Sequence, residues 1–133
     1  AGYLHDLGKL AVSKSILDKP GNLDVAERNV IRSHTFYTYR LLQAIKGFDT
    51  INKWASFHHE KLNGKGYPEK LDEKTLTKED QLIAFADIFQ ALTEDRPYRN
   101  GMNPKNAIDI MKDMAEKGYL CNSMLSDFKQ VVL

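Results

Sequence analysis

Cysteine is almost absent from this sequence: Cys121 is the single one among 133 residues, which excludes an internal disulfide and suits a reducing compartment. The formal net charge is only +1, so no overall field attracts a nucleic acid or an anionic membrane. The longest apolar run, residues 82–89, is far shorter than the roughly 20 residues needed to cross a bilayer, and Asp87 interrupts it. No secretory signal peptide is visible. We therefore predict a cytoplasmic chain without a membrane segment and without a nucleic-acid polymer as its partner.

Several common catalytic arrangements are also missing. The sequence has no serine elbow of the GxSxG type, no GxxxxGK phosphate-binding loop and no cysteine–histidine pair. Histidine itself is scarce, with four residues in the whole chain. A hydrolase built from these residues would use metal-activated water as its nucleophile.

Helical periodicity and capping signals predict a single all-α domain over residues 1–133, with no strand of convincing alternation. The sequence opens without a helix cap, so we expect native sequence upstream and the end of a helix at residues 3–7, stopped by Gly8 in a left-handed conformation. A loop is expected over residues 10–23. Further helices are predicted at residues 25–46, from Asp49 or Thr50 to about residue 63, and at residues 77–93, 104–117 and 123–133.

Capping boxes are expected at two of these helices, formed by Asp24 with Glu27 and by Thr77 with Asp80. The helix over residues 77–93 is apolar on nearly every side, which places it in the middle of the domain. The helix over residues 25–46 has an apolar stripe that is expected to face inward: Val30, Ile31, His34, Tyr37, Leu41, Leu42 and Ile45.

All four histidines and two aspartates occur at positions that could share a metal centre: His5, Asp6, His34, His58, His59 and Asp87. They fall on four separate predicted helices, and in a helical bundle facing helices each send one or two side chains into a common centre. Imidazole with carboxylate ligands suits iron, manganese or a similar ion, and the adjacent pairs could span two ions. A buried carboxylate such as Asp87 needs a partner or a metal ion.

Each of these residues also has an ordinary structural explanation. His34 could be a hydrogen-bonded core histidine, His58 and His59 a capping or surface pair, and Asp87 the partner of Arg96 or a lysine. For a metal site to be absent, however, every histidine in the chain would have to be incidental. The cations near these motifs are Lys9, Lys65, Arg96 and Arg99; the two arginines flank Pro97 and could clamp a phosphate, or could simply be solvated.

Taken in order, five segments resemble the HD-GYP subgroup of the HD phosphohydrolases: His5-Asp6 with Gly8-Lys9, then KPGNL, His34, HHEKLNGKGYP and ADIFQALTEDRPYR. This resemblance implies a helical bundle of the HD type that holds two or three divalent ions, commonly iron or manganese, between facing helices. It also implies hydrolysis of cyclic di-GMP to linear pGpG or GMP by a metal-activated hydroxide. Upstream sensory or receiver domains are usual in the family, and diguanylate cyclase domains are possible partners.

The resemblance assigns roles residue by residue. His5, Asp6, His34, His58, His59 and Asp87 fall on metal-ligand positions, and Asp6 would bridge two ions. Asp6 and Lys9 are the expected catalytic residues, while Lys9, Tyr67, Arg96 and Arg99 are the expected substrate-binding residues.

The sequence departs from the family pattern at a few positions. Thr35 and Thr38 replace the usual proline and glycine, and Gln90 replaces a frequent aspartate. The family's first ligands lie upstream of the HD pair. A non-catalytic domain that binds cyclic di-GMP or a partner protein, and a general HD-type nucleotide phosphohydrolase, are therefore alternative hypotheses.

Overall fold

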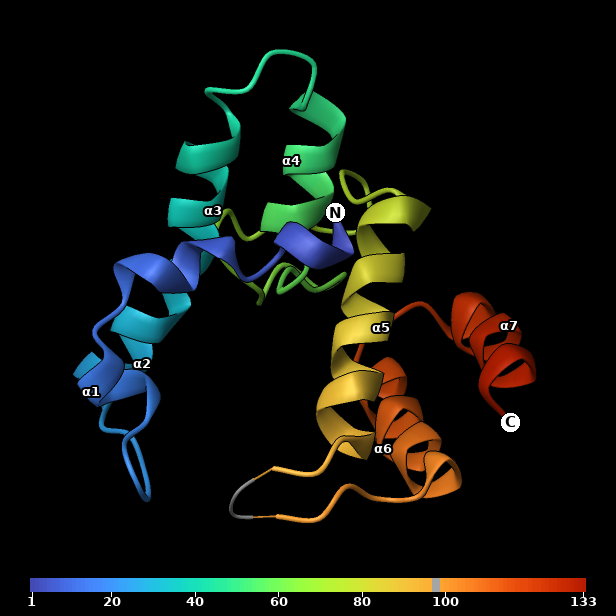
Figure 1. The fold of residues 1–133 in the computed structure, drawn as a ribbon. Coiled ribbons are helices and arrows are strands. Elements are labelled where there is room, and N and C mark those ends of the chain that lie inside the picture. Colours follow the sequence, from blue (N-terminus) through green and yellow to red (C-terminus); the bar gives the residue numbers. More distant parts are fainter. Residues whose placement is uncertain (97–98) are drawn as a thin grey trace.

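The computed structural model describes residues 1–96 and 99–133, and the regular elements of this part of the chain are all helices and 3-10 turns (Figure 1). Its strand-like features are two isolated bridges, Asn63 with Asp72 and Arg96 with Arg99. None of the described helices combines the length and the apolar character needed to cross a membrane. The elements in order are the 3-10 turns η1 (Gly2–Leu4) and η2 (Leu7–Ala11), then α1 (Lys14–Leu17), α2 (Val25–Arg32), α3 (His34–Leu42), α4 (Asp49–Ser56), α5 (Lys78–Thr93), α6 (Pro104–Glu116) and α7 (Asn122–Val132).

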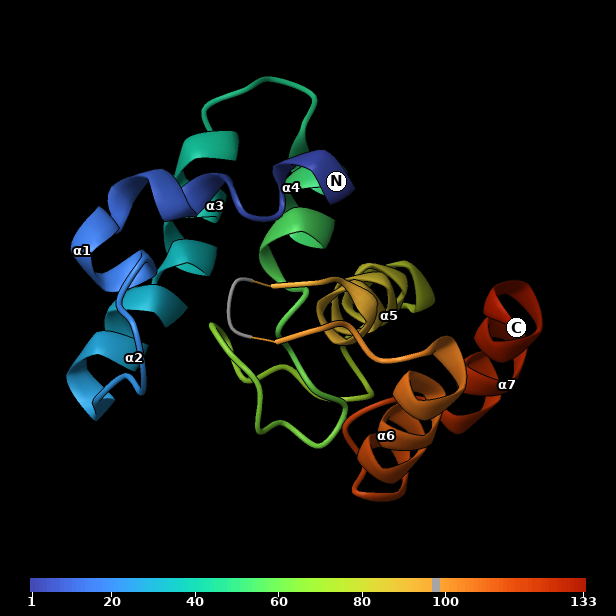
Figure 2. The same ribbon diagram turned by 60° about the horizontal axis from the view of Figure 1, so that its bottom comes forward.

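Helix α5 stands in the middle of the molecule, as predicted. In both views α3 and α4 lie on one side of it and α6 and α7 on the other, while the N-terminal turns pass close to α3 and α4 (Figures 1 and 2). The largest apolar cluster fills the space between α5, α6 and α7, and its fully buried members are Phe85 and Met111. The expected all-α class is therefore confirmed.

The start of α5 ties this helix to α4. The Thr77–Asp80 capping box is present. The fully buried Asp80 carboxylate also forms an ion pair with Lys53 of α4, with Nζ 3.1 Å from Oδ2. A buried carboxylate requires such partners because it loses its hydration. This connection fixes α4, which leads to His58, relative to the helix that carries Asp87.

The prediction of one helix over residues 25–46 was wrong, because the chain breaks at Ser33 into α2 and α3. Its N-terminal capping box of Asp24 and Glu27 is present as predicted. At the break, three consecutive side chains, Ser33, His34 and Thr35, bond to the carbonyl oxygens three residues before them. Side-chain bonds to nearby carbonyls compete with the helical backbone pattern.

The predicted inward stripe was also partly wrong. Val30, Tyr37, Leu41 and Ile45 are each at least 40% exposed, whereas the buried positions of α3 are His34, Thr35, Thr38 and Leu42. The turn η2 packs against α3 on this more polar side, which determines the face that becomes buried.

Gly8 has a different role from the left-handed helix stop that was expected. It lies buried within η2, and a Cβ atom there would be 1.8 Å from the carbonyl oxygen of His34. Its N–H donates to Thr38 Oγ1 at 2.9 Å, and the same hydroxyl donates to the carbonyl oxygen of His5 at 3.2 Å. Thr38, one of the departures from the family pattern, therefore holds the His5–Gly8 segment against α3.

The other differences concern element ends. The helix expected to continue to about residue 63 ends at Ser56, and its N-cap is Phe48 rather than Asp49 or Thr50. The predicted loop over residues 10–23 contains the short helix α1. The bounds of α5 and α6 agree with the sequence prediction to within one residue, and α7 begins one residue earlier than expected.

Candidate metal centre

The six predicted ligands converge, although not from four helices as expected. His5 and Asp6 lie between η1 and η2, and His34 is the first residue of α3. His58 and His59 follow the end of α4 on a turn, and Asp87 lies within α5. Only His34 and Asp87 are therefore inside helices. The others occupy turns next to helix ends, where adjacent side chains can be directed into one centre.

Two groups of donor atoms meet around His58. His34, His58 and His59 form one group, and His5, Asp6 and His58 form the other; within each group the ligand atoms lie within 4.8 Å of one another. The rings of His58 and His59 have centroids 4.1 Å apart. Asp87 joins the second group through its Oδ1, which lies 3.5 Å from His5 Nε2. The shared histidine makes this one continuous cluster.

Three of the histidines are oriented in the same way. The Nδ1 atoms of His5, His34 and His58 each contact the carbonyl oxygen three residues earlier, at 2.5, 2.6 and 2.8 Å. A carbonyl oxygen only accepts, so Nδ1 carries a proton in all three rings, and in the neutral rings of His34 and His58 Nε2 keeps its lone pair. The Nε2 atoms of His34 and His58 are buried and have no hydrogen-bond partner within the described residues. A buried nitrogen without a hydrogen-bond partner indicates a missing ligand, and a divalent cation would accept the lone pair of such a nitrogen.

The protonation states favour the same conclusion. Burial lowers the pKa of His34, lowers that of His58 to about 4 and lowers that of His59 to about 3, so all three imidazoles are neutral at pH 7. The hydrogen bond to Asp87 raises the pKa of His5, although its burial opposes this. Neutral imidazole is the form that binds metal ions.

Both carboxylates are ionised. Burial favours the neutral acid, but the hydrogen bond and charge of Lys9 hold the pKa of Asp6 below its ordinary value. The pKa of Asp87 is likewise lowered: burial raises it, but the hydrogen bond to His5 and the charge interactions with His58, His59 and His5 together outweigh burial. The two carboxylates add anionic oxygen donors to the imidazole nitrogens, and this donor set fits divalent iron or manganese better than a thiolate-binding ion.

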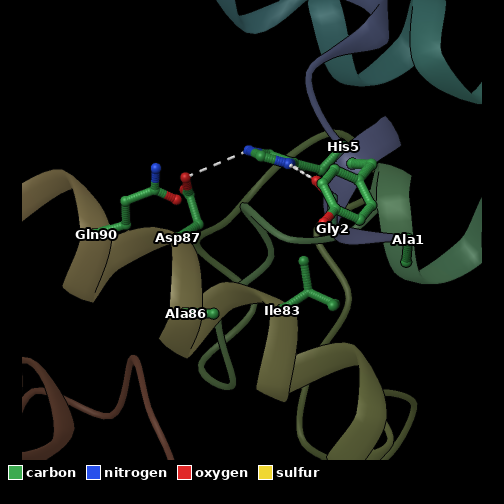
Figure 3. A pocket seen from close by; sticks show the side chains of 8 residues that line it. Ala1, Gly2, His5, Ile83, Ala86, Asp87 and Gln90 are labelled. Carbon is green, nitrogen blue, oxygen red and sulfur yellow. Dashed lines mark hydrogen bonds and ion pairs between the residues drawn. The ribbon is translucent and has the colours of Figure 1, made fainter. Parts of the chain in front are cut away.

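Two cavities open beside the cluster. A polar pocket of about 130 Å³ is lined by the cations Lys9 and Arg96, by the carboxylates Asp6, Asp87 and Glu94, and by His5, Gln90 and Ala91. A larger cavity of about 620 Å³ is also lined by His5 and Asp87, and its walls include Ile83, Ala86 and Gln90 of α5 (Figure 3). Gln90 thus borders both cavities.

The predicted cations differ in their positions. Lys9 Nζ lies 2.6 Å from Asp6 Oδ2, and Arg96 lines the polar pocket. Arg99 does not line that pocket; its Nη2 donates to the carbonyl oxygen of Ala91 at 2.6 Å. Lys65 is exposed and lines neither cavity. Pro97, expected to stiffen the turn between the arginines, lies outside the described residues.

Tyr67 lies over the cluster. Its ring stacks on His59 with a centroid distance of 4.8 Å, and the Arg32 guanidinium lies 5.2 Å from the ring centroid. Burial raises the pKa of Tyr67 to about 12, so the phenol keeps its proton and can donate a hydrogen bond. Sequence reasoning missed Arg32, because nothing in its local pattern distinguishes it from any exposed helical arginine.

Comparison with known proteins identifies the family. Residues 1–120 match the model of the HD domain. The chain belongs to the HD-domain family. Its relatives include a 3′3′-cGAMP-specific phosphodiesterase of Vibrio cholerae, 44% identical over 113 residues that make up 85% of this chain and 25% of the relative.

Two further relatives carry a related description. A cyclic di-GMP phosphodiesterase of Pseudomonas aeruginosa is 36% identical over 85% of this chain and 28% of its own length. A cyclic di-GMP phosphodiesterase response regulator of Xanthomonas campestris is 35% identical over 90% of this chain and 32% of its own length. These relatives and the GYP segment make this an HD domain of the HD-GYP type. The chain spans only a quarter to a third of these relatives, by the same figures.

Proposed function

We propose that this HD domain is a metal-dependent phosphodiesterase that hydrolyses a cyclic dinucleotide, with cyclic di-GMP as the leading substrate. The observation that carries the proposal is the pair of buried, unpartnered Nε2 atoms of His34 and His58, directed into a cluster that also borders a pocket with Lys9 and Arg96. Relatives named for cyclic dinucleotide phosphodiesterase activity support it.

The cofactor in this proposal is two or three divalent ions, iron or manganese. One would be held by His34, His58 and His59, and another by His5, Asp6 and Asp87 with His58 nearby. What the ions would supply is a water-derived nucleophile at neutral pH and Lewis acidity toward the phosphoryl oxygens. Asp6 would contribute to both sites; its Oδ1 faces His34 at 3.3 Å and its Oδ2 faces His5 at 3.5 Å, which supports this role.

The surrounding residues would bind and neutralise the phosphates. Lys9 holds Asp6 in place and offers its ammonium group to the polar pocket, where Arg96 adds a second cation. These charges would stabilise the negative charge that develops on phosphorus-bound oxygens. Tyr67 would donate from its protonated phenol at the edge of the site, and Arg99 would contribute beside the pocket. Asp6 and Lys9 are the proposed catalytic residues; Lys9, Tyr67, Arg96 and Arg99 are the proposed substrate-binding residues.

A mixed cyclic dinucleotide, 3′3′-cGAMP, is the second candidate substrate. The side chain of Gln90 borders both cavities and carries an amide, which has one donor group and one acceptor. An amide matches the donor and acceptor edge of adenine, whereas guanine presents adjacent donors that suit a carboxylate. The relative that is 44% identical is named for this mixed dinucleotide.

The test is hydrolysis by the full-length protein loaded with Mn²⁺ or Fe²⁺, with cyclic di-GMP, 3′3′-cGAMP and a panel of mononucleotides, and with pGpG and GMP resolved as products. We expect turnover of a cyclic dinucleotide that is abolished in the His5→Ala/Asp6→Ala variant and retained in Asp18→Ala, an exposed control. Binding without turnover would favour a sensor domain. Preferred hydrolysis of mononucleotides would favour a general HD-type phosphohydrolase.

The remaining proposals concern context. We propose that residues 1–133 form a single HD-GYP-type domain that lies downstream of a sensory or receiver domain in the cytoplasm, with diguanylate cyclase domains as further partners. The response-regulator name of the Xanthomonas relative supports a receiver domain.

A further inference from the structure

Glu60, which follows the two adjacent histidines directly, is a buried carboxylate with an unusual set of partners. The residue is only 5% exposed. Its Oε1 accepts from the backbone N–H of Glu69 at 2.6 Å, and its Oε2 accepts from the backbone N–H of Leu71 at 2.9 Å. Within the described residues no ion pair involves Glu60. Its desolvation is therefore offset by backbone donors of one loop rather than by a cation.

These two bonds close the loop that carries Tyr67. The bridge between Asn63 and Asp72 joins the two segments of chain at the base of the loop. Nearer the tip, the N–H of Tyr67 donates to the carbonyl oxygen of His59 at 3.3 Å. Glu60 binds the segment that follows Tyr67, through the N–H groups of Glu69 and Leu71. The loop is thus attached to the histidine segment on both sides of the tyrosine.

At Gly66 the loop packs directly against the backbone of the histidine segment. A Cβ atom on Gly66 would lie 2.5 Å from the Cα of Glu60 and 2.6 Å from the carbonyl oxygen of His59. Two backbones can approach this closely only where one residue lacks a side chain. The position of Tyr67 on His59 is consequently fixed by backbone contacts and by the Glu60 carboxylate together.

Glu60 is not arranged as a metal ligand. Both of its oxygens are directed to loop amides, and it belongs to neither group of converging donor atoms in the described part of the chain. In this it differs from Asp6, whose oxygens face two histidines.

We propose that Glu60 is a positioning residue: by binding the N–H groups of Glu69 and Leu71 it holds the Tyr67 loop against His59 and so sets the affinity for substrate. The first step, the closing of the loop, stands on the contacts above. The second step, the effect on substrate, rests on the proposed function.

Glu60→Gln is the informative substitution, because it keeps the shape of the side chain. An amide has one accepting oxygen, and its NH₂ group would face a backbone N–H, so one of the two bonds is lost. We expect hydrogen exchange at the amides of Glu69 and Leu71 in the metal-loaded protein to accelerate about tenfold or more. Bound metal, measured by elemental analysis, should stay unchanged. Glu73→Gln, which changes an exposed glutamate directly after the base of the loop, is the matched control and should alter neither quantity.

In the kinetic arm, Glu60→Gln should raise KM for the cyclic dinucleotide about tenfold while kcat changes by less than about threefold. Because the effect passes through Tyr67, combining it with Tyr67→Ala should add little to the increase caused by Tyr67→Ala alone. If Glu60→Gln does not fold, Glu60→Asp, which keeps the charge but shortens the reach, replaces it in every measurement.

The outcomes separate the two steps. Unchanged exchange at Glu69 and Leu71 would overturn the closing of the loop, whatever the activity. Faster exchange accompanied by metal loss, by a fall in kcat alone, or by additive effects with Tyr67→Ala would overturn the substrate role. If the wild-type protein hydrolyses no cyclic dinucleotide, the proposed function fails, yet the exchange measurement still decides the role of Glu60.

Discussion

Nε2 of His34 faces Oδ1 of Asp6 at 3.3 Å, across the contact between the N-terminal turns and α3. The imidazole is buried and neutral, and its Nε2 has no hydrogen-bond partner among the described residues. The carboxylate is ionised and held by Lys9. The lone pair of this nitrogen and the negative charge of the carboxylate would both attract a cation placed between them.

Divalent ions should therefore stabilise the fold. Addition of Mn²⁺ at 100 times its dissociation constant contributes about 2.7 kcal/mol by mass action, which for a domain of this size corresponds to a rise in Tm of about 10 °C. The measurement is a thermal melt with Mn²⁺ and with a chelator. In His34→Ala the increase should largely disappear; an equal increase in this variant would count against the site.

The stability of the metal-free protein should fall as the solution is acidified from pH 6.5 to 4. In the fold, burial holds the pKa of His58 at about 4 and that of His59 at about 3, against 6.5 as the ordinary value. The unfolded chain then binds more protons in this window, so the free energy of unfolding drops by about a few kcal/mol. The raised pKa of His5 does not compensate, because its contribution is already complete below pH 6.5.

Urea unfolding at several pH values in the presence of a chelator provides the measurement. His59→Gln, which removes one buried imidazole, should flatten the dependence. Stability that is constant, or that increases toward pH 4, would show that the histidines are not buried as neutral groups.

Gly8→Ala should separate the N-terminal turns from α3. The added Cβ would lie 1.8 Å from the carbonyl oxygen of His34, which is backbone and cannot move away alone. We expect a loss of about 3 kcal/mol or more in the free energy of unfolding, with weakened Mn²⁺ binding because Asp6 moves away from His34. Gly2→Ala, where a Cβ meets nothing within 4 Å, is the control. Equal stability of the two variants would contradict the packing described.

Gln90→Asp should change the choice of base. A carboxylate accepts from both adjacent donors of guanine, whereas adenine offers it one donor and a ring-nitrogen acceptor that it repels, so the ratio of kcat/KM for cyclic di-GMP over 3′3′-cGAMP should rise about tenfold. Gln90→Asn, which keeps the amide, serves as the comparison. A ratio that is the same in Gln90→Asp and wild type would remove Gln90 from base recognition.

Sequence patterns predicted the second half of the fold well. The capping signals at Thr77 and Asn103 act within one turn of the chain, and both helices begin where these residues place them. The break at Ser33 was not predictable from periodicity, because the side chains of Ser33, His34 and Thr35 bond to carbonyls that a continuous helix would use.

The sequence predicted the members of the candidate site better than it predicted the helices and turns that carry them. Scarcity of histidine singled out the cluster, and the structure brings these residues together. What could not be foreseen was the identity of the face that η2 covers, since Gly8 and Thr38 meet through tertiary contact. For the same reason the exposure of Val30 and Tyr37 was missed. The role of Glu60 depends on a loop geometry that no periodic pattern encodes.

The Nδ1 bonds of His5, His34 and His58 to carbonyls three residues earlier have a consequence for how fast ions enter and leave. Each ring takes its orientation from its own stretch of backbone, so the coordinating atoms are already aimed before any ion arrives. Loading should thus proceed without a search through side-chain rotamers, and its rate should follow the water-exchange rate of the incoming ion. Exchanging one transition metal for another would then leave the protein framework in place.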